Sequence, residues 1–373
     1  MSATHGPDRI RELNSLAILD YLRSVDEATV SQIAQETGLS RTSVGATIAD
    51  CEELGWVASL PPAPSITGRP AKRYRFQSEA GVVVGLDIGA NHIDVMATNL
   101  IGASLASARA DVSPDEPAPQ RLGAALALLD SALEAQGVVR ERLTVISVAL
   151  TGPVDAEGRS PYGTPLPGWD AVDTSRELRD RYGCAVLVEN DCKCALAAEA
   201  WTGQAQDLSS AAYIVAGARI GASFMPGRGR GCRRGRRPEG AEVEFHSGSV
   251  PHALASAHRH RDAPGRPVGV RSGARGGPRG YQDRALLWSQ PGRRRLRSGP
   301  HGRPGISASA DVWMDAFTQR LTELVLRVPD VRTSNLGSQA VVLGAVRRGL
   351  NHIEALTLGD TLRGPQALFD EQR

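Results

Sequence analysis

The feature that most constrains the fold is an apolar run at residues 82–88 that ends in Asp87-Ile88-Gly89. A run of this length that stops at a glycine predicts a continuous β-strand. Further strands are predicted at residues 93–98, 104–112, 145–150, 185–188 and 211–215, and helices at 120–136 and 191–201. Strands and helices mixed in this order predict an α/β domain.

A different pattern precedes this domain. Apolar residues three or four apart predict helices at 8–22 and 30–37, with Thr29 as N-cap and a turn at Gly38-Leu39. Ser40 is expected to cap a third helix at 41–54, whose inward face is Val44, Ile48 and Cys51 or Leu54. Strands at 56–58 and 73–76 with a proline-rich tip at 60–70 predict a hairpin, so the order is that of a winged helix-turn-helix.

This N-terminal module predicts binding to double-stranded DNA. In a helix-turn-helix, the first residues of the second helix enter the major groove, which here nominates Arg41, Thr42, Ser43 and Thr47. The wing adds Arg69, Lys72 and Arg73, which suit phosphate or minor-groove contacts. A helical protein-interaction module of the same shape is the alternative, and the basic wing after the helices favours DNA. Paired half-sites lead us to expect a homodimer.

The amino-acid composition limits which classes of protein this chain can belong to. Hydrophobic residues make up 41% of the 373, no apolar run approaches the length of a membrane helix, and the N-terminus is polar, so we expect a cytoplasmic protein without a membrane partner. Five irregularly spaced cysteines predict no disulfide framework. Cys192 and Cys194 lack further ligands at metal-binding spacing, so the pair predicts two small helix residues on different faces and no metal site.

Residues 225–305 break the pattern. They hold eighteen arginines, no lysine and five acidic residues, a local charge of +13 in a chain whose net charge is +2. We expect no regular elements there, and so long an irregular stretch is unusual inside a compact domain. One interpretation is that this part of the gene is read out of frame, because ordered patterns resume at 310–327 and 340–350 as helices. The other is a basic insertion that binds nucleic acid.

The winged helix followed by VVVGLDIGANHI at 82–93 resembles the ROK family of repressors and sugar kinases. GTPLPGW at 163–169, VENDCKCALAAEAW at 188–201 and NLGSQAVVLGA at 335–345 resemble further motifs of the family. The resemblance implies a two-lobed, ribonuclease-H-like (actin-like ATPase) sugar-kinase fold. We therefore expect a DNA-binding domain at 1–79, a sensor domain at 80–350 and a C-terminal tail at 351–373.

The resemblance also implies a sugar site made of Asn190, Asp191, Glu242 and Gly168, with residues 166–168 shaping its wall. In a kinase of this family, Asp191 would take the proton from the attacking sugar hydroxyl. Asp191 alone could be a helix N-cap, but the Asn190-Asp191 pair after a strand favours sugar binding.

The phosphate side departs from the family. Asp87, Gly89, Gly217 and Gly221 match its phosphate loops, but Ala90 and Arg219 stand where glycines let the backbone approach phosphate. We therefore expect no ATP or magnesium. The family's zinc motif needs a run of cysteines after His246, and that region offers only Cys232, so no zinc or other cofactor is expected.

Together these features predict a non-catalytic regulator that binds operator DNA and responds to a monosaccharide or sugar phosphate. Two alternatives remain open. One is an active sugar kinase with a DNA-binding appendage, and the other is a damaged regulator that has kept only its DNA binding.

Overall fold

The computed structural model describes residues 7–61, 71–161, 163–216, 220–225, 284–289, 319–320, 322–323 and 329–357. The chain divides into two compact units, the first formed by residues 1–198 and 341–373 and the second by 199–340. The expected domain limits remain predictions. Within the described residues, no helix is both long and apolar enough to cross a membrane.

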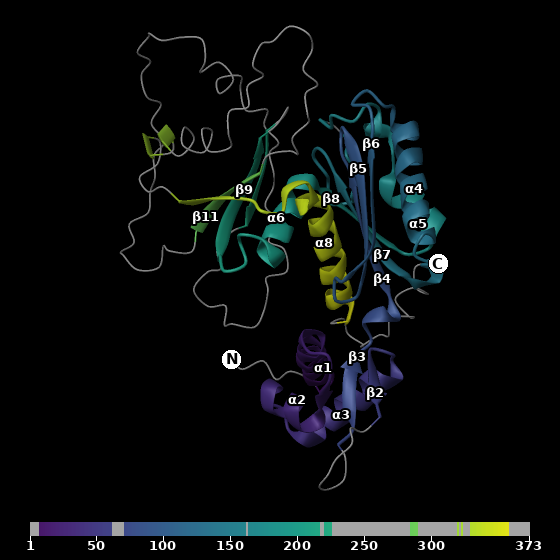
Figure 1. The fold of residues 1–373 in the computed structure, drawn as a ribbon, viewed down its shortest axis with the longest axis vertical. Coiled ribbons are helices and arrows are strands. Elements are labelled where there is room, and N and C mark those ends of the chain that lie inside the picture. The colour runs from purple at the N-terminus through teal and green to yellow at the C-terminus, as the bar shows by residue number, and fades with distance from the viewer. Residues whose placement is uncertain are drawn as a thin grey trace. The chain divides into compact units, whose positions relative to one another are not determined.

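The first unit begins with the winged helix (Figure 1). Its elements are α1 (Pro7–Ser24), β1 (Ala28–Thr29), α2 (Val30–Thr37), α3 (Arg41–Glu53), β2 (Val57–Leu60) and β3 (Arg73–Phe76). The strands form an antiparallel sheet in the order β1-β3-β2. Apart from β1, which was not predicted, this is the predicted order of elements.

Local chemistry sets the limits of these helices. Thr29 caps α2 through a capping box with Gln32, and Gly38 ends that helix with a φ of 72° that suits glycine. Ser40 caps α3 by accepting the amide of Ser43. The caps predicted at Thr29 and Ser40 and the turn at Gly38 are thus confirmed. Beneath them, the fully buried Trp56 stacks on Phe76.

A five-stranded sheet follows the winged helix. Its strands are β4 (Val82–Ile88), β5 (His92–Asn99), β6 (Ser104–Asp111), β7 (Leu143–Leu150) and β8 (Ala185–Asn190), in the order β6-β5-β4-β7-β8. The first three pair antiparallel, whereas β4, β7 and β8 run parallel. Every residue of β4 is buried, as its apolar run predicts.

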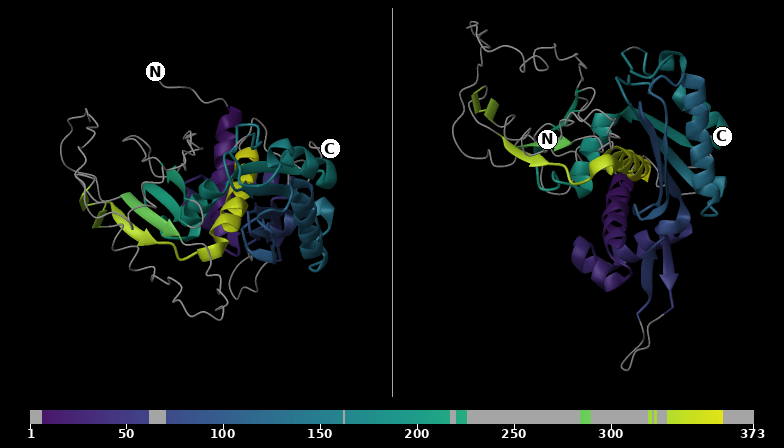
Figure 2. Two further views of the ribbon diagram at one scale, coloured as in Figure 1. Left: turned by 90° about the horizontal axis from the view of Figure 1, so that it is seen from above. Right: turned by 45° about the horizontal axis from the view of Figure 1, so that its top comes forward.

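Helices cover both faces of this sheet. They are α4 (Ala118–Glu134), α5 (Thr174–Tyr182), α6 (Asp191–Thr202) and α8 (Ala340–Thr357), with short 3-10 turns at η1 (Ser78–Ala80), η2 (Arg140–Arg142), η3 (Trp169–Ala171) and η4 (Gly337–Gln339). Figures 1 and 2 place α4 and α5 on one face and α8 on the other. The sequence missed α5, and α8 extends seven residues past its predicted end.

The second unit holds a four-stranded sheet of β9 (Ser210–Ala216), β10 (Ile220–Met225), β11 (Arg284–Ser289) and β12 (Asp330–Thr333). Its order, β10-β9-β11-β12, and its strand directions repeat those of β5-β4-β7-β8. Strand β11 contradicts the expectation that residues 225–305 lack regular elements, because the apolar run in its sequence RALLWS pairs with two neighbours. The helix predicted at 310–327 lies largely outside the described residues.

Helix α8 packs on the first sheet through glycines. A Cβ on Gly344 would lie 1.6 Å from the carbonyl oxygen of Cys194 in α6. One on Gly85 of β4 would lie 2.5 Å from the carbonyl oxygen of Val342, and one on Gly349 2.6 Å from Val83. Three glycines therefore set how closely α8 approaches β4 and α6.

We expect Gly344→Ala to lower the free energy of unfolding by about 3 kcal/mol or more, because the added methyl meets backbone that cannot rotate away. The control is Gly123→Ala on the exposed face of α4, where a Cβ has nothing within 4 Å. That variant should gain about 0.5–1 kcal/mol from helix propensity. Urea unfolding followed by circular dichroism measures both, and equal effects would contradict the close packing of α8.

Candidate functional site

The first turn of α3 faces solvent. Arg41 and Thr42 are exposed and Ser43 is half-buried. The exposed face continues along the helix through Gly45, Ala46 and Ala49. A face with polar residues in its first turn and small residues after them can enter a DNA groove without steric obstruction.

The prediction that Thr47 also faces the groove is wrong. Thr47 is 5% exposed and lies on the buried face of α3 with Val44, Ile48 and Cys51. Positions three, four and seven residues after Val44 share one helix face, which places Thr47 in the core. Its polar side chain suggested a surface position that the helical period does not allow.

The basic residues of the wing already have partners. Lys72 Nζ lies 3.4 Å from Glu52 Oε1 and 5.0 Å from the centre of the Tyr74 ring. Arg73 forms an ion pair with Glu27. Exposed pairs of this kind contribute at most about 1 kcal/mol, so a phosphate could replace either carboxylate. Arg75 on β3 is also exposed and was not predicted, and Arg69 lies outside the described residues.

Within the first unit, a junction of charged side chains joins the winged helix to α8. Both terminal nitrogens of Arg347 on α8 bind the carboxylate of Glu354, at 3.2 and 3.1 Å. Arg23 at the end of α1 lies 3.9 Å from the same carboxylate, and its guanidinium covers the ring of Phe76 at 4.9 Å. Elements α1, β3 and α8 therefore meet at Glu354.

The candidate sugar site lies where the parallel strands β4, β7 and β8 end. The carboxyl ends of parallel strands meet at one edge of a sheet, which is where α/β folds place their ligands. Asp87 precedes the last residue of β4, Thr151 and Gly152 follow β7, and Asn190 ends β8. The sheet thus brings the first predicted phosphate loop and the Asn190-Asp191 pair to the same edge.

Asn190 is fully engaged within the chain. Its amide nitrogen donates to the Gly152 carbonyl oxygen at 2.8 Å and to Asp191 Oδ1 at 2.9 Å. Its amide oxygen accepts from the backbone nitrogens of Cys192 and Lys193, at 3.0 and 3.2 Å. These four bonds use its donors and acceptors, so Asn190 is the N-cap of α6 and positions Asp191.

Asp191 is the residue suited to meet a ligand. Burial, followed by the negative charge of Asp87, raises the pKa of its carboxyl to about 6. The backbone amide of Cys192 donates to Oδ1 at 2.8 Å and opposes this shift. A carboxyl that ionises near neutrality can accept a hydroxyl proton or a hydrogen bond from a sugar.

The loop at 163–169 packs over the end of β7. Thr164 Oγ1 donates to the carbonyl oxygen of Thr151 at 3.0 Å, and Gly152 has a φ of 117° that suits glycine. Gly168 has a φ of 73° and precedes the fully buried Trp169, whose indole donates to Thr174 Oγ1 at 3.2 Å. The loop is anchored, as a wall beside the site requires.

The turn after β4 is fixed from below by Arg121. This fully buried side chain donates to the carbonyl oxygens of Gly89 at 2.6 Å and Ala90 at 3.2 Å. It also donates to the carbonyl oxygen of Ser113 at 2.7 Å. The sequence did not reveal this role, because an arginine in an amphipathic helix is ordinarily a surface residue.

The other residues singled out in the sequence add little to the description of the candidate sugar site. Gly217 and Glu242 lie outside the described residues, and Gly221 lies within β10 of the second unit. Cys192 and Cys194 are buried, and burial raises the pKa of both thiols, so neither is poised as a thiolate.

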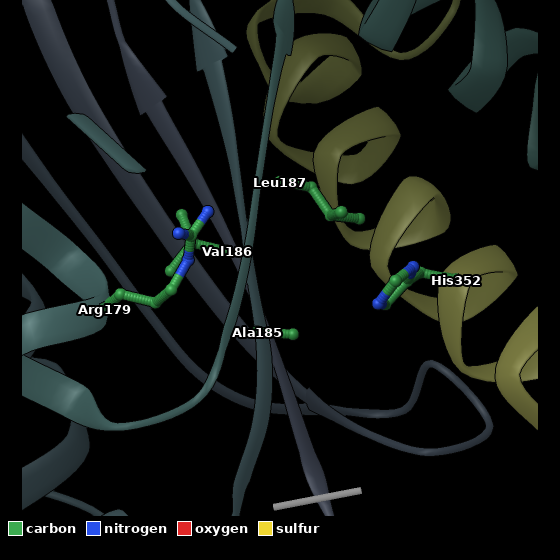
Figure 3. Close-up of a pocket in the computed structure, with 5 residues that line it drawn as sticks. All are labelled: Arg179, Ala185, Val186, Leu187 and His352. Atoms are coloured by element: carbon green, nitrogen blue, oxygen red, sulfur yellow. The ribbon is translucent and has the colours of Figure 1, made fainter. Parts of the chain in front are cut away.

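A pocket of ≈ 290 Å³ beside β8 is lined by Arg179, Ala185, Val186, Leu187 and His352 (Figure 3). It offers few polar groups and lies apart from Asp191.

Two further clusters escaped the sequence analysis. The carboxylate of Glu189 on β8 forms ion pairs with Lys193 Nζ at 3.0 Å and with Arg348 Nη2 of α8 at 2.9 Å. His92 lies between the buried Asp87 and Asp94. Their members come from different strands and helices, and strand register brings them together.

Comparison with known proteins agrees with this arrangement. Residues 83–236 match the family model described as ROK family, and residues 12–64 match the one described as MarR family. A solved ROK family transcriptional regulator, a homologue of the E. coli MLC protein, superposes with a TM-score of 0.57 at 14% identity and covers 98% of this chain and 99% of its own. The predicted fold, a winged helix-turn-helix followed by a ribonuclease-H-like domain, is confirmed.

Two curated relatives match a smaller part of the chain. The putative xylose repressor of Caldicellulosiruptor sp. (strain Rt8B.4) is 24% identical over 220 residues, which are 58% of this chain and 55% of that protein. The xylose repressor of Bacillus subtilis (strain 168) is 19% identical over 212 residues, 57% and 55% of the two chains. The chain spans about half the length of the curated relatives it matches.

We expect the stability of the Asp191→Asn variant relative to the wild type to depend on pH. The folded pKa of Asp191, about 6, exceeds the ordinary value of 3.8. Well below pH 3.8 the carboxyl is protonated in both states, and as the pH rises from there to 6 it ionises first in the unfolded chain, so the wild type loses stability over that range. The variant should gain about 1–3 kcal/mol on the wild type by pH 7.

Chemical unfolding at pH 4, 5, 6 and 7 measures this difference. The control, Asp180→Asn, removes a carboxylate that is 72% exposed, and it should change stability by less than about 0.5 kcal/mol. A difference between Asp191→Asn and wild type that stays constant with pH would contradict the raised pKa.

Proposed function

Because the chain joins a ROK-family domain to a MarR-type winged helix, we propose that it is a DNA-binding repressor of carbohydrate-metabolism genes that responds to a sugar. The observation that carries this proposal is the exposed first turn of α3 in the winged helix. Glu354 joins this winged helix to α8, which packs on the sheet whose ligand edge holds Asp191. Its partners are operator DNA and a monosaccharide or sugar phosphate. It acts in the cytoplasm as a homodimer, because two-fold proteins match paired half-sites.

The relatives supply the first sugar to test. Both are named as xylose repressors, so xylose stands at the head of the panel. Asp191 would accept hydrogen bonds from its hydroxyls, while Gly168 and its loop shape the wall and Asn190 holds the carboxylate in place. Glu242 remains a proposed second acid.

A sugar changes DNA affinity only if it binds one global state better than another. Glu354 is the contact through which such a difference would reach the winged helix, because it joins α8 to α1. The sugar site and this junction share α8 as a neighbour, since Arg348 of that helix binds Glu189, next to Asn190.

A sugar kinase is the second candidate. The pKa of Asp191 near 6 favours it, since a catalytic base works best when it ionises near the operating pH. Against it stand Ala90 and Arg219 in the phosphate loops. A damaged regulator is the third, because the match to the ROK family model ends at residue 236.

We expect Arg41→Ala to weaken binding to a DNA site selected by the full chain by about 1–3 kcal/mol, because one base or phosphate contact is lost. The control is Arg176→Ala, which removes the same charge from α5, where the side chain is 76% exposed. Fluorescence anisotropy at fixed salt measures both. If neither the full-length wild type nor the Arg41→Ala variant binds DNA even at low salt, the assignment of DNA binding is refuted.

We expect one monosaccharide of a panel to release the wild type from this DNA, and Asp191→Asn to bind the DNA normally but lose at least about tenfold in sugar affinity, because a hydrogen bond to a charged group is worth about 1.5–3 kcal/mol. The readout is the sugar concentration for half-release. Asp180→Asn should respond as the wild type does.

The same samples distinguish the alternatives. ATP-dependent phosphorylation of a sugar that Asp191→Asn abolishes would establish the kinase. DNA binding that no sugar alters would favour the damaged regulator.

A further inference from the structure

Two buried aspartates face each other on neighbouring strands beside the sugar edge. Asp87 of β4 and Asp94 of β5 are directly paired in the antiparallel register and are 2% and 7% exposed. His92 at the start of β5 inserts its ring between them. Its Nε2 lies 3.1 Å from Asp87 Oδ2 and 3.7 Å from Asp94 Oδ2. One ligand atom from each of the three residues lies within 4.8 Å of the others.

The two distances from His92 Nε2 are close to those between neighbouring ligand atoms in a tetrahedral coordination sphere. Zinc binds histidine nitrogen and carboxylate oxygen at about 2.0–2.2 Å. Tetrahedral geometry then separates neighbouring ligand atoms by about 3.3–3.6 Å. The two separations from His92 Nε2 bracket this value, and the two carboxylate oxygens lie within 4.8 Å of each other, so rotation of the aspartate side chains could bring all three ligand atoms around one ion.

The charge around the cluster also favours a cation. Asp87 and Asp94 are buried, and buried carboxylates need a compensating positive charge. Arg109 Nη1 lies 2.6 Å from Asp94 Oδ2, but it approaches from β6 and is 44% exposed. Arg121, the nearest buried arginine beneath this turn, donates its bonds to backbone carbonyls. Asp87 has His92 alone as its ion-pair partner among the described residues.

The ligand set points to the class of metal. Imidazole together with carboxylates suits zinc and its transition-metal neighbours, whereas magnesium and calcium prefer oxygen alone. Arg109 would orient Asp94 from outside the coordination sphere, as partners of metal-bound carboxylates do. The His92 side chain is 29% exposed and opens the cluster to solvent, which provides an entry path and leaves a position for water.

We propose that Asp87, His92 and Asp94 form a binding site for a divalent transition-metal ion such as Zn²⁺. This site is distinct from the cysteine motif that the resemblance leads one to expect after His246. It needs neither the second unit nor the sugar, because all three ligands come from β4 and β5. A bound ion would tie the start of β5 to the end of β4 and so brace the turn at Gly89.

The test uses the full chain after chelation and dialysis, with Co²⁺ as a spectroscopic probe. We expect one equivalent of Co²⁺ per chain, with the visible absorption of a low-symmetry site, and its displacement by Zn²⁺. His92→Ala and Asp94→Asn should each weaken Zn²⁺ binding at least tenfold in calorimetric titration. The control, His352→Gln, removes the other described histidine, on α8, and should bind as the wild type does.

Circular dichroism establishes that each variant is folded before titration. Absence of stoichiometric binding by the wild type would overturn the proposal and leave Asp87, His92 and Asp94 as a hydrogen-bonded triad. Binding of equal strength in wild type, His92→Ala and Asp94→Asn would overturn it as well, since the ion would then occupy other ligands, such as the histidines of 225–305. Neither result bears on operator binding, so the proposed function is tested separately.

Discussion

Close contact between α8 and the sheet beneath it is the constraint on which the first unit depends. Gly85, Gly344 and Gly349 remove the side chains that would separate α8 from β4 and α6. A helix from the end of the chain thereby becomes the cover for strands from its middle. Because α8 is held at this distance, Glu354 near its last turn reaches Arg23 of the winged helix. The packing of one helix thus determines where the two functional parts meet.

Much of this architecture could be predicted because local patterns agree with the global fold. The apolar run at 82–88 became a strand buried along its whole length. Thr29, Gly38 and Ser40 act where their side chains or φ preferences place them. Helix α5 escaped notice because its sequence, TSRELRDRY, is largely polar and depends on Leu178 and Tyr182 packing into the core. Two apolar residues four apart are too few to reveal the helical period in the sequence.

The candidate site was predicted less completely because its members are joined by register. Asp87 and Asp94 are opposite each other only once β4 and β5 pair. Arg121 of α4 reaches the turn at Gly89 from 32 residues further along the chain. Asn190 matched a sugar-binding motif, yet the structure uses its whole hydrogen-bonding capacity to cap α6 and hold Asp191. A sequence motif locates the residues of a site, but only the structure shows which of them is free to bind a ligand and which holds its neighbour in place.

The two units differ in what they need from residues 225–305. The main hydrophobic core of the first unit is built from residues 82–188, with α4 and α5 against one face of the sheet. Its other face is covered by α8, so the unit also requires the sequence from residue 340 onward, while the described residues of its main core cluster all lie outside 225–305. The second sheet, in contrast, places β11 from within the segment between β9 and β12. A change in 225–305 would therefore alter the second unit first, and the winged helix, the Glu354 junction and the Asp191 edge would keep their supporting contacts.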